Sequence, residues 1–147
     1  MLAWFKRIWR SVTVGPDGTD DRGAAGERIA ATFLEKRMGY AIVVSNWRNP
    51  LNRREEIDLV CRDRDVLVFV EVKTRLAAAL VPGYYAVNRH KKKVLRRAIH
   101  AYLTQLGARP RTFRFDVAEV VTSAKVPPQV LHYQNVPLFP RGYHVLR

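Results

Sequence analysis

The chain has 147 residues, a length that suits one domain, and 48% of them are hydrophobic, enough to form a core. It contains no apolar run of about 20 residues, which excludes a membrane-spanning helix, and its single cysteine excludes a disulfide framework and a cysteine-based zinc site. The balance of 26 Lys and Arg against 13 Asp and Glu gives a formal net charge of +13, which favours polyanionic partners. We therefore expect a cytoplasmic protein that binds nucleic acid, with an anionic membrane surface as the second choice.

The N-terminal segment, residues 1–22, is set apart by its pattern. Its start, "MLAWFKRIWRSV", lacks the continuous apolar centre and the small-residue cleavage site of a secretory signal. It could form a basic amphipathic helix that touches a membrane surface, packs on the domain or packs on a second copy. The stretch "GPDGTDDRG" (15–23) is typical of a turn-rich linker. We expect the main domain to span residues 23–139 and a tail to span 140–147.

The first half of the domain reads as a helix followed by three strands. Apolar residues recur at helical spacing from Ala24 to Met38, and Gly39 is a typical stop. Three strand patterns follow, and "RD" at 64–65 joins the last two so tightly that they should be antiparallel neighbours. The patterns are "YAIVVSNWR" (40–48), then after the loop "NPLNRRE" (49–55) "EIDLVCRD" (56–63), and finally "VLVFVEVKTR" (66–75).

The second half of the domain predicts one helix and one or two strands. After an irregular crossing, Asn88 is a candidate N-cap for a helix over 89–105. A fourth strand is predicted over 112–122, and a short fifth one over 127–136 at a sheet edge, because prolines precede it. This order predicts an α/β domain with a mixed central sheet of four to five strands flanked by helices.

Two charged residues at the end of the third strand, Glu71 and Lys73, indicate a candidate functional site. Side chains alternate along a strand, so Glu71 and Lys73 share one face with Leu67 and Phe69. Both faces of the middle of this strand are apolar, which indicates a central strand covered on both sides. On the preceding strand Ile57, Leu59 and Cys61 are expected to face one side, and Glu56 and Asp58 the other. A hairpin closed at residues 63–65 then brings Asp58 near Glu71.

Two carboxylates and a lysine in a partly dry site suit a hard divalent cation. Mg²⁺ takes oxygen ligands and keeps several waters, and it can polarise a phosphoryl oxygen and help to generate a hydroxide nucleophile. Lys73 can pair with the carboxylates, position water or face the phosphate. A structural salt bridge at a strand end is the other reading of the same residues.

Three strand motifs, "EIDLVCRD", "FVEVKTR" and "RFDVAEV", with the opening "GAAGERIAATFLEKRMGY" and the closing "VLHYQNVPLF", resemble the YraN-like family, also called UPF0102. The resemblance covers roughly residues 22–139. That family belongs to the PD-(D/E)XK nuclease-like superfamily, so the resemblance implies a restriction-endonuclease-like core and a metal-dependent nuclease acting on DNA or RNA, with DNA favoured and branched structures possible substrates. It implies Mg²⁺ or Mn²⁺ as cofactor and, by analogy, a homodimer.

The resemblance also assigns roles to individual residues. It makes Asp58 and Glu71 the metal-binding carboxylates, the carbonyl of Val72 a third ligand, Lys73 the motif lysine and Glu27 an acid that reaches toward the metal or its water shell. Basic residues near the second helix would grip phosphates without reading sequence; these are Arg75, Arg89, Lys91, Lys92 and Arg96.

Four features leave alternatives open. Glu55 stands where the family pattern has a glycine, which puts the geometry of the nearby loop in question. Glu56 is either an accessory ligand or a charge at a strand end. Asp116 is expected to be structural, in contact with one of the helices, and the four histidines show no ligand spacing. A non-catalytic nucleic-acid-binding module that retains the nuclease fold is the alternative function.

Overall fold

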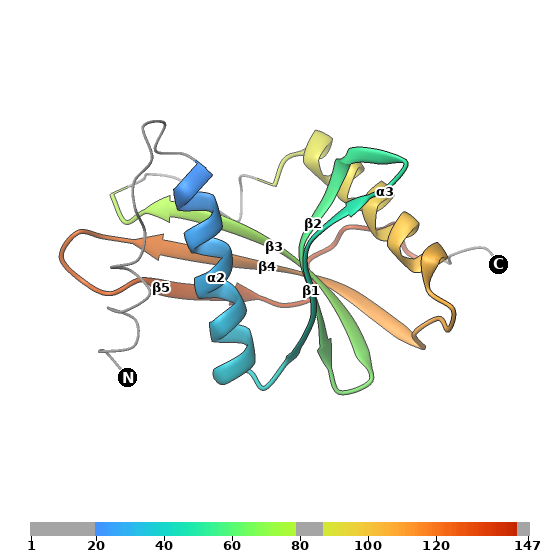
Figure 1. Ribbon diagram of the computed structural model, residues 1–147, viewed down its shortest axis with the longest axis horizontal. Helices are drawn as coiled ribbons and strands as arrows, with labels where there is room; N and C mark the ends of the chain where they lie inside the picture. Colours follow the sequence, from blue (N-terminus) through green and yellow to red (C-terminus); the bar gives the residue numbers. More distant parts are fainter. Residues whose placement is uncertain (1–19, 79–86, 144–147) are drawn as a thin grey trace.

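A computed structural model of the chain describes residues 20–78 and 87–143. These residues form a five-stranded sheet with helix α2 on one face and helix α3 on the other (Figure 1). The N-terminal segment through residue 19, most of the crossing before the second helix and the end of the tail lie outside the described residues. The elements in chain order are α2 (Asp20–Lys36), β1 (Ala41–Asn49), β2 (Asn52–Asp63), β3 (Val66–Leu76), α3 (Arg89–Gln105), β4 (Thr112–Thr122) and β5 (Gln129–Tyr133).

The predicted bounds are correct for the second helix and wrong at the start of the first. Helix α3 has the predicted bounds, and the Asn88 side chain caps it by accepting a hydrogen bond from the Lys91 N–H at 2.9 Å. The predicted linker is wrong at its end, since α2 begins at Asp20. A glycine such as Gly23 costs a helix only about 1 kcal/mol, so the turn-rich composition did not prevent a helical start. Gly39 adopts a φ of 73°, the left-handed conformation expected after a helix.

The sheet has the strand order β1-β2-β3-β4-β5 and is mixed, as predicted. Strand β3 is central: it pairs antiparallel with β2 and parallel with β4, while β1 and β5 lie at the edges. Strand β2 starts at Asn52, so only Pro50 and Leu51 remain of the predicted seven-residue loop. The hairpin from β1 to β2 is therefore longer than its sequence indicated.

Each face of β3 is buried under one helix. Leu67 and Phe69 belong to the core beneath α3, whereas Val68 and Val70 belong to the core beneath α2. This confirms the predicted alternation and the central position of the strand. Burial of each such large apolar side chain contributes about 1.5–3 kcal/mol to the stability of the fold. The buried middle of β3 therefore fixes the position of the charged residues at its C-terminal end.

Strand β2 departs from the predicted alternation at Asp58. Leu59 and Cys61 pack on the same face, beneath α2, as expected, but Ile57 packs beneath α3, on the opposite face. At the same level β1 carries Asn46 in the left-handed conformation, with φ 53°. The chain turns here because β1 and β2 leave β3 and bend toward α3 (Figure 1). The sheet splits at Asp58, and the split positions the candidate site.

Candidate functional site at the split of the sheet

Asp58 closes the split between β2 and β3. The paired residues of the two strands end at Leu59 and Val70, which places Asp58 at the level of Glu71. The carboxylate oxygen Oδ2 of Asp58 accepts a hydrogen bond from the Val72 N–H at 2.7 Å. A side chain thus satisfies the backbone donor that the departing strand leaves behind, and this bond fixes the carboxylate beside Glu71.

Glu71 is the most deeply buried charge of the site, with 2% of its surface exposed. Its Oε1 atom lies 3.0 Å from the Nζ of Lys73 and 3.4 Å from the Nζ of Lys91. Among the described residues its other oxygen, Oε2, is buried and has no hydrogen-bond partner. Such an orphaned acceptor is costly, and a ligand that offers positive charge or a donor would relieve the cost.

Burial and neighbouring negative charges raise the pKa values of Asp58 and Glu27. Burial, and then the negative charge of Glu71, raise the pKa of Asp58 to about 8, against the hydrogen bond from Val72 N–H that lowers it. Burial also raises the pKa of Glu27; a hydrogen bond with Asn46 opposes this shift, while the charges of Glu56 and Glu71 add to it. The lysines therefore do not fully neutralise the site, and a divalent cation would be attracted to it.

Glu27 reaches the site because α2 approaches β3 very closely at the preceding residue. A Cβ atom added at Gly26 would lie 1.9 Å from the Oγ1 of Thr74. Only glycine permits this approach, which brings the next side chain toward Asn46. Sequence reasoning missed Asn46; the polar pair Ser45–Asn46, which interrupts the apolar run of this strand, was the available signal.

The donors present fit a hard cation in part. Asp58 and Glu71 supply carboxylate oxygens, the type that Mg²⁺ and Mn²⁺ take, and the buried Oε2 of Glu71 has no other use in the described part of the chain. No three His, Cys, Asp or Glu side chains in the described ranges gather closely enough to form a complete cage. The cation would keep several waters, which is the usual habit of Mg²⁺.

The other predicted phosphate-binding residues come from α3 and from the end of β3. Arg89 is exposed, and Lys92 is partly exposed beside it. Arg96 donates a hydrogen bond to the Leu138 carbonyl at 3.1 Å, which ties α3 to the segment after β5. Arg75 forms an ion pair with the buried Glu119. The structure thus brings Lys91 to Glu71, leaves Arg89 and Lys92 accessible in the first turn of α3, and engages Arg75 and Arg96 within the fold.

A family model named "Uncharacterised protein family UPF0102" matches residues 26–120. The chain belongs to the UPF0102 family. Among its relatives are UPF0102 proteins of Beutenbergia cavernae, 41% identical over 80% of this chain and 96% of the relative, and of Alkaliphilus metalliredigens, 37% identical over 77% and 93%. One of Symbiobacterium thermophilum is 46% identical over 67% of this chain and 80% of the relative.

The match confirms the resemblance read from the sequence motifs. Glu27, Asp58, Glu71, Lys73 and Lys91 all fall within the matched residues. The mixed sheet between two helices is consistent with the restriction-endonuclease-like core that the resemblance implied. None of the helices described for this UPF0102 protein is long and apolar enough to cross a membrane.

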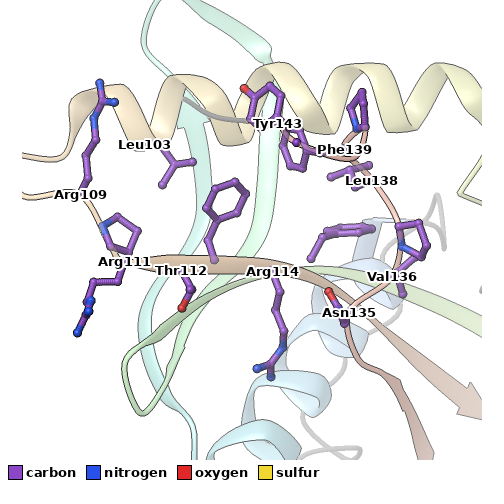
Figure 2. A pocket seen from close by; sticks show the side chains of 16 residues that line it. Leu103, Arg109, Arg111, Thr112, Arg114, Asn135, Val136, Leu138, Phe139 and Tyr143 are labelled. Carbon is purple, nitrogen blue, oxygen red and sulfur yellow. The ribbon is translucent and has the colours of Figure 1, made fainter. Parts of the chain in front are cut away.

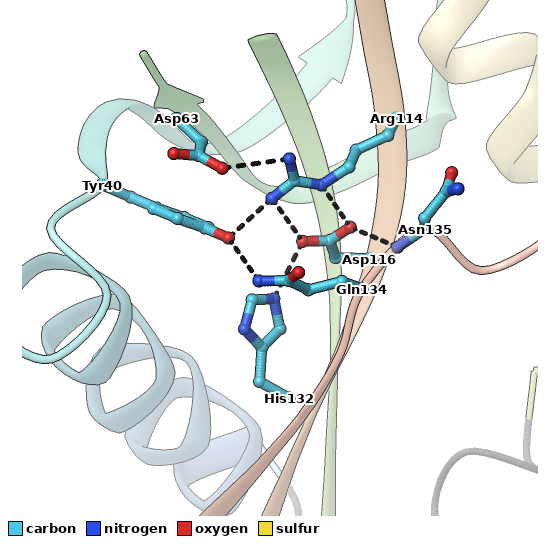
Figure 3. Close-up of polar contacts among 7 residues, drawn as sticks. All are labelled: Tyr40, Asp63, Arg114, Asp116, His132, Gln134 and Asn135. Atoms are coloured by element: carbon cyan, nitrogen blue, oxygen red, sulfur yellow. Dashed lines mark hydrogen bonds and ion pairs between the residues drawn. The ribbon is translucent and has the colours of Figure 1, made fainter.

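Asp116 lies in a separate buried network (Figure 3). It accepts hydrogen bonds from Arg114 Nε at 3.0 Å and from the Asn135 N–H at 2.9 Å, and its Oδ2 lies 2.8 Å from His132 Nε2. Burial would raise the pKa of Asp116, but these bonds, His132 first, outweigh burial and lower it. These partners come from β4, from β5 and from the segment after it, not from the expected helices. We interpret the network as structural. Arg114 extends it by donating hydrogen bonds to Asp63 and Tyr40, and Gln134 donates to the same tyrosine hydroxyl.

A cavity of about 490 Å³ lies away from Asp58 and Glu71, at the C-terminal end of α3 (Figure 2). It is lined by the end of α3, the start of β4 and the segment after β5, and it includes no predicted site residue. Its lining contains no Asp or Glu, so no pair of acids converges there. A large pocket is the usual first candidate for a site, but the chemistry here favours the split of the sheet.

Proposed function

We propose that this UPF0102 protein is a cytoplasmic, metal-dependent nuclease that hydrolyses phosphodiester bonds at the Asp58–Glu71 site, in DNA before RNA. One observation carries the proposal: two lysines converge on one oxygen of a buried glutamate whose second oxygen has no partner among the described residues, beside an aspartate with a raised pKa. Perturbed acids next to lysines are typical of catalytic sites.

Asp58 and Glu71 would hold Mg²⁺ or Mn²⁺, together with the Val72 carbonyl that the family resemblance implies. When bound, the ion would polarise the phosphoryl oxygen and acidify the attacking water. Asp58 must lose its proton to serve as a ligand. Glu71 can offer Oε2 without breaking a hydrogen bond to any of the described residues. The hydrogen bond from the Val72 N–H holds the aspartate in place throughout.

The chain's own residues supply positioning and charge. Lys73, 3.0 Å from Glu71, can orient a water and stabilise negative charge on the phosphate as it develops. Glu27, with its raised pKa, can accept a proton or hold a water at the rim. Lys91 faces the same glutamate from α3, where Arg89 and Lys92 continue the positive charge outward to grip phosphates.

The test is a cleavage assay with the full chain. Linear, flapped, four-way and single-stranded DNA, with matched RNA, would be incubated with Mn²⁺, Mg²⁺ or EDTA. We expect metal-dependent cutting that Lys73→Ala abolishes without loss of binding. Lys125→Ala, an exposed lysine in the β4–β5 connection, is the control for lost charge and should cut normally.

Two results would overturn the nuclease proposal. One is wild-type protein that cuts none of these substrates; if it binds them with an affinity that falls steeply with salt, the non-catalytic binding module is the better description. The other is cutting that Lys73→Ala retains. Metal binding has an independent readout, because saturating Mn²⁺ at about 100 times Kd would stabilise the wild type by about 2.7 kcal/mol. Glu71→Gln should lose this shift. Sedimentation of the wild type would show whether it is the homodimer that the resemblance implies.

A further inference from the structure

The turn between β1 and β2 presents a leucine to solvent. Leu51 is 94% exposed, whereas the other exposed large hydrophobic residues in the described ranges are 37–56% exposed. With Pro50 it forms the whole connection between the two strands. Single exposed hydrophobic residues are common on proteins, so exposure alone does not assign a role to this one.

The fold holds this tip with a buried carboxylate. Glu55 is 9% exposed, and its two oxygens accept hydrogen bonds from the Asn49 amide at 2.7 Å and the Asn52 amide at 3.2 Å. The Leu51 N–H in turn donates to the Asn49 side chain at 3.0 Å. A buried carboxylate needs hydrogen-bond partners, and here its partners are the two asparagines on either side of the turn, so the three side chains fix the tip. This is the glutamate that replaces the glycine of the family pattern.

Arginines flank the tip in the sequence and indicate the kind of ligand that it binds. Arg53 and Arg54 follow it and are exposed, and Arg48 precedes it, paired with Glu56 at 3.0 Å. A ligand with anionic edges and an apolar interior complements this surface, and stacked bases between phosphates are such a ligand. One leucine contributes too little apolar area to hold a membrane, but one apolar side chain is enough to wedge open a base step.

The tip is continuous with the candidate site. The β1–β2 hairpin extends past α3 (Figure 1), and β2 carries both the tip and Asp58. Leu51 and Asp58 are separated by about seven residues, which span at most about 23 Å along a strand. At about 3.4 Å per nucleotide this corresponds to about seven nucleotides. A nucleic acid held at the tip can therefore reach the acids.

We propose that the braced tip is a wedge: Leu51 inserts at an unstacked step, such as a branch point, while Arg53 and Arg54 contact the flanking phosphates. This proposal rests on the proposed nuclease function, and it specifies the substrate class of that nuclease as nucleic acid with an opened or branched step. It places the cut within about seven nucleotides of the branch.

The test compares Leu51→Ser with Val126→Ser, a 56%-exposed valine in the β4–β5 connection, as the matched control. The probes are a flapped DNA with 2-aminopurine at the branch and a linear duplex of the same sequence, both in EDTA. We expect wild type and Val126→Ser to prefer the flap and to raise the fluorescence. Leu51→Ser should lose about tenfold of that preference, the value of one buried leucine, and leave duplex binding unchanged. Glu55→Ala should lose part of the preference with Leu51 still present.

The outcomes separate the wedge from the proposed function. If Leu51→Ser binds the flap in EDTA like the wild type, and also cuts it like the wild type in the separate cleavage assay with Mn²⁺, the wedge is wrong and the nuclease stands. If the wild type binds neither probe, both proposals fall. If Leu51→Ser instead changes only flotation with anionic vesicles, or only the oligomeric state, the tip meets a membrane or a second copy and the wedge is overturned.

Discussion

Lys91 of α3 and Glu71 of β3 are joined across the split of the sheet, with the Nζ atom of the lysine 3.4 Å from Oε1 of the glutamate. The two residues are 20 positions apart in the sequence, and the crossing between them is mostly outside the described residues. This contact ties the basic start of α3 to the buried acid, so that the surface expected to hold phosphates and the residues expected to hold a metal meet at one oxygen.

Replacing Lys91 should separate the two functions of this surface. Lys91→Ala removes a positive charge that competes with a metal for Glu71, so we expect Mn²⁺ to bind about tenfold more tightly. DNA should bind more weakly, with a salt slope lower by about one. Lys92→Ala, on the same turn without a contact to Glu71, should weaken DNA binding and leave metal affinity unchanged. Calorimetric titration of both variants checks this, and looser Mn²⁺ binding by Lys91→Ala would contradict it.

Asp58 should make the unliganded protein less stable as pH rises. Its pKa is about 8 in the folded state against an ordinary value of 3.8, so the folded protein binds the extra proton between these values. The stabilising contribution is complete below pH 3.8 and is lost as the pH rises through about 8, with a slope of at most about 1.4 kcal/mol per pH unit. Asp58→Asn should flatten this slope in urea melts, whereas the exposed Glu35→Gln should retain it.

Gly26 should not tolerate a side chain. The added Cβ of Gly26→Ala would lie 1.9 Å from Thr74 Oγ1, so the helix must withdraw or the threonine must rotate. We expect a loss of about 1–3 kcal/mol in the free energy of unfolding. Thr74→Ala removes the obstructing oxygen and should restore most of the loss in the double variant. Gly23→Ala, with nothing within 4 Å of the added atom, is the control. Additive effects of the two substitutions would contradict the close approach.

The Asp116 network should matter for stability and not for cleavage. Asp116→Asn places amide hydrogens against Arg114 and His132, which already donate, so we expect a loss of about 3 kcal/mol. Because its folded pKa is lowered, the contribution of Asp116 is present above its ordinary value of 3.8 and is lost as the pH falls. Asp63→Asn, a partly exposed partner of Arg114, should cost less than about 1 kcal/mol. Thermal melts at pH 7 check both variants, with cleavage normalised to folded protein as the second readout.

The sequence alone determined the parts of this protein that depend on local periodicity. It fixed the bounds of α3, its Asn88 cap, the central position of β3 and the level of Asp58 against Glu71, because strand alternation and a tight turn leave little freedom. Its family motifs indicated Glu27, Asp58, Glu71 and Lys73 as candidates, and the family itself is confirmed.

The tertiary structure decided what depends on strands parting and on contacts between distant segments. Alternation could not show that β2 changes face at Asp58, since that turn arises where β1 and β2 leave β3 for α3. Nor could it show that Lys91 meets Glu71 or that Glu55 is buried to hold Leu51 outward. A local pattern records which side a residue prefers, but the partner of a charge is set by packing between elements that the sequence does not place side by side.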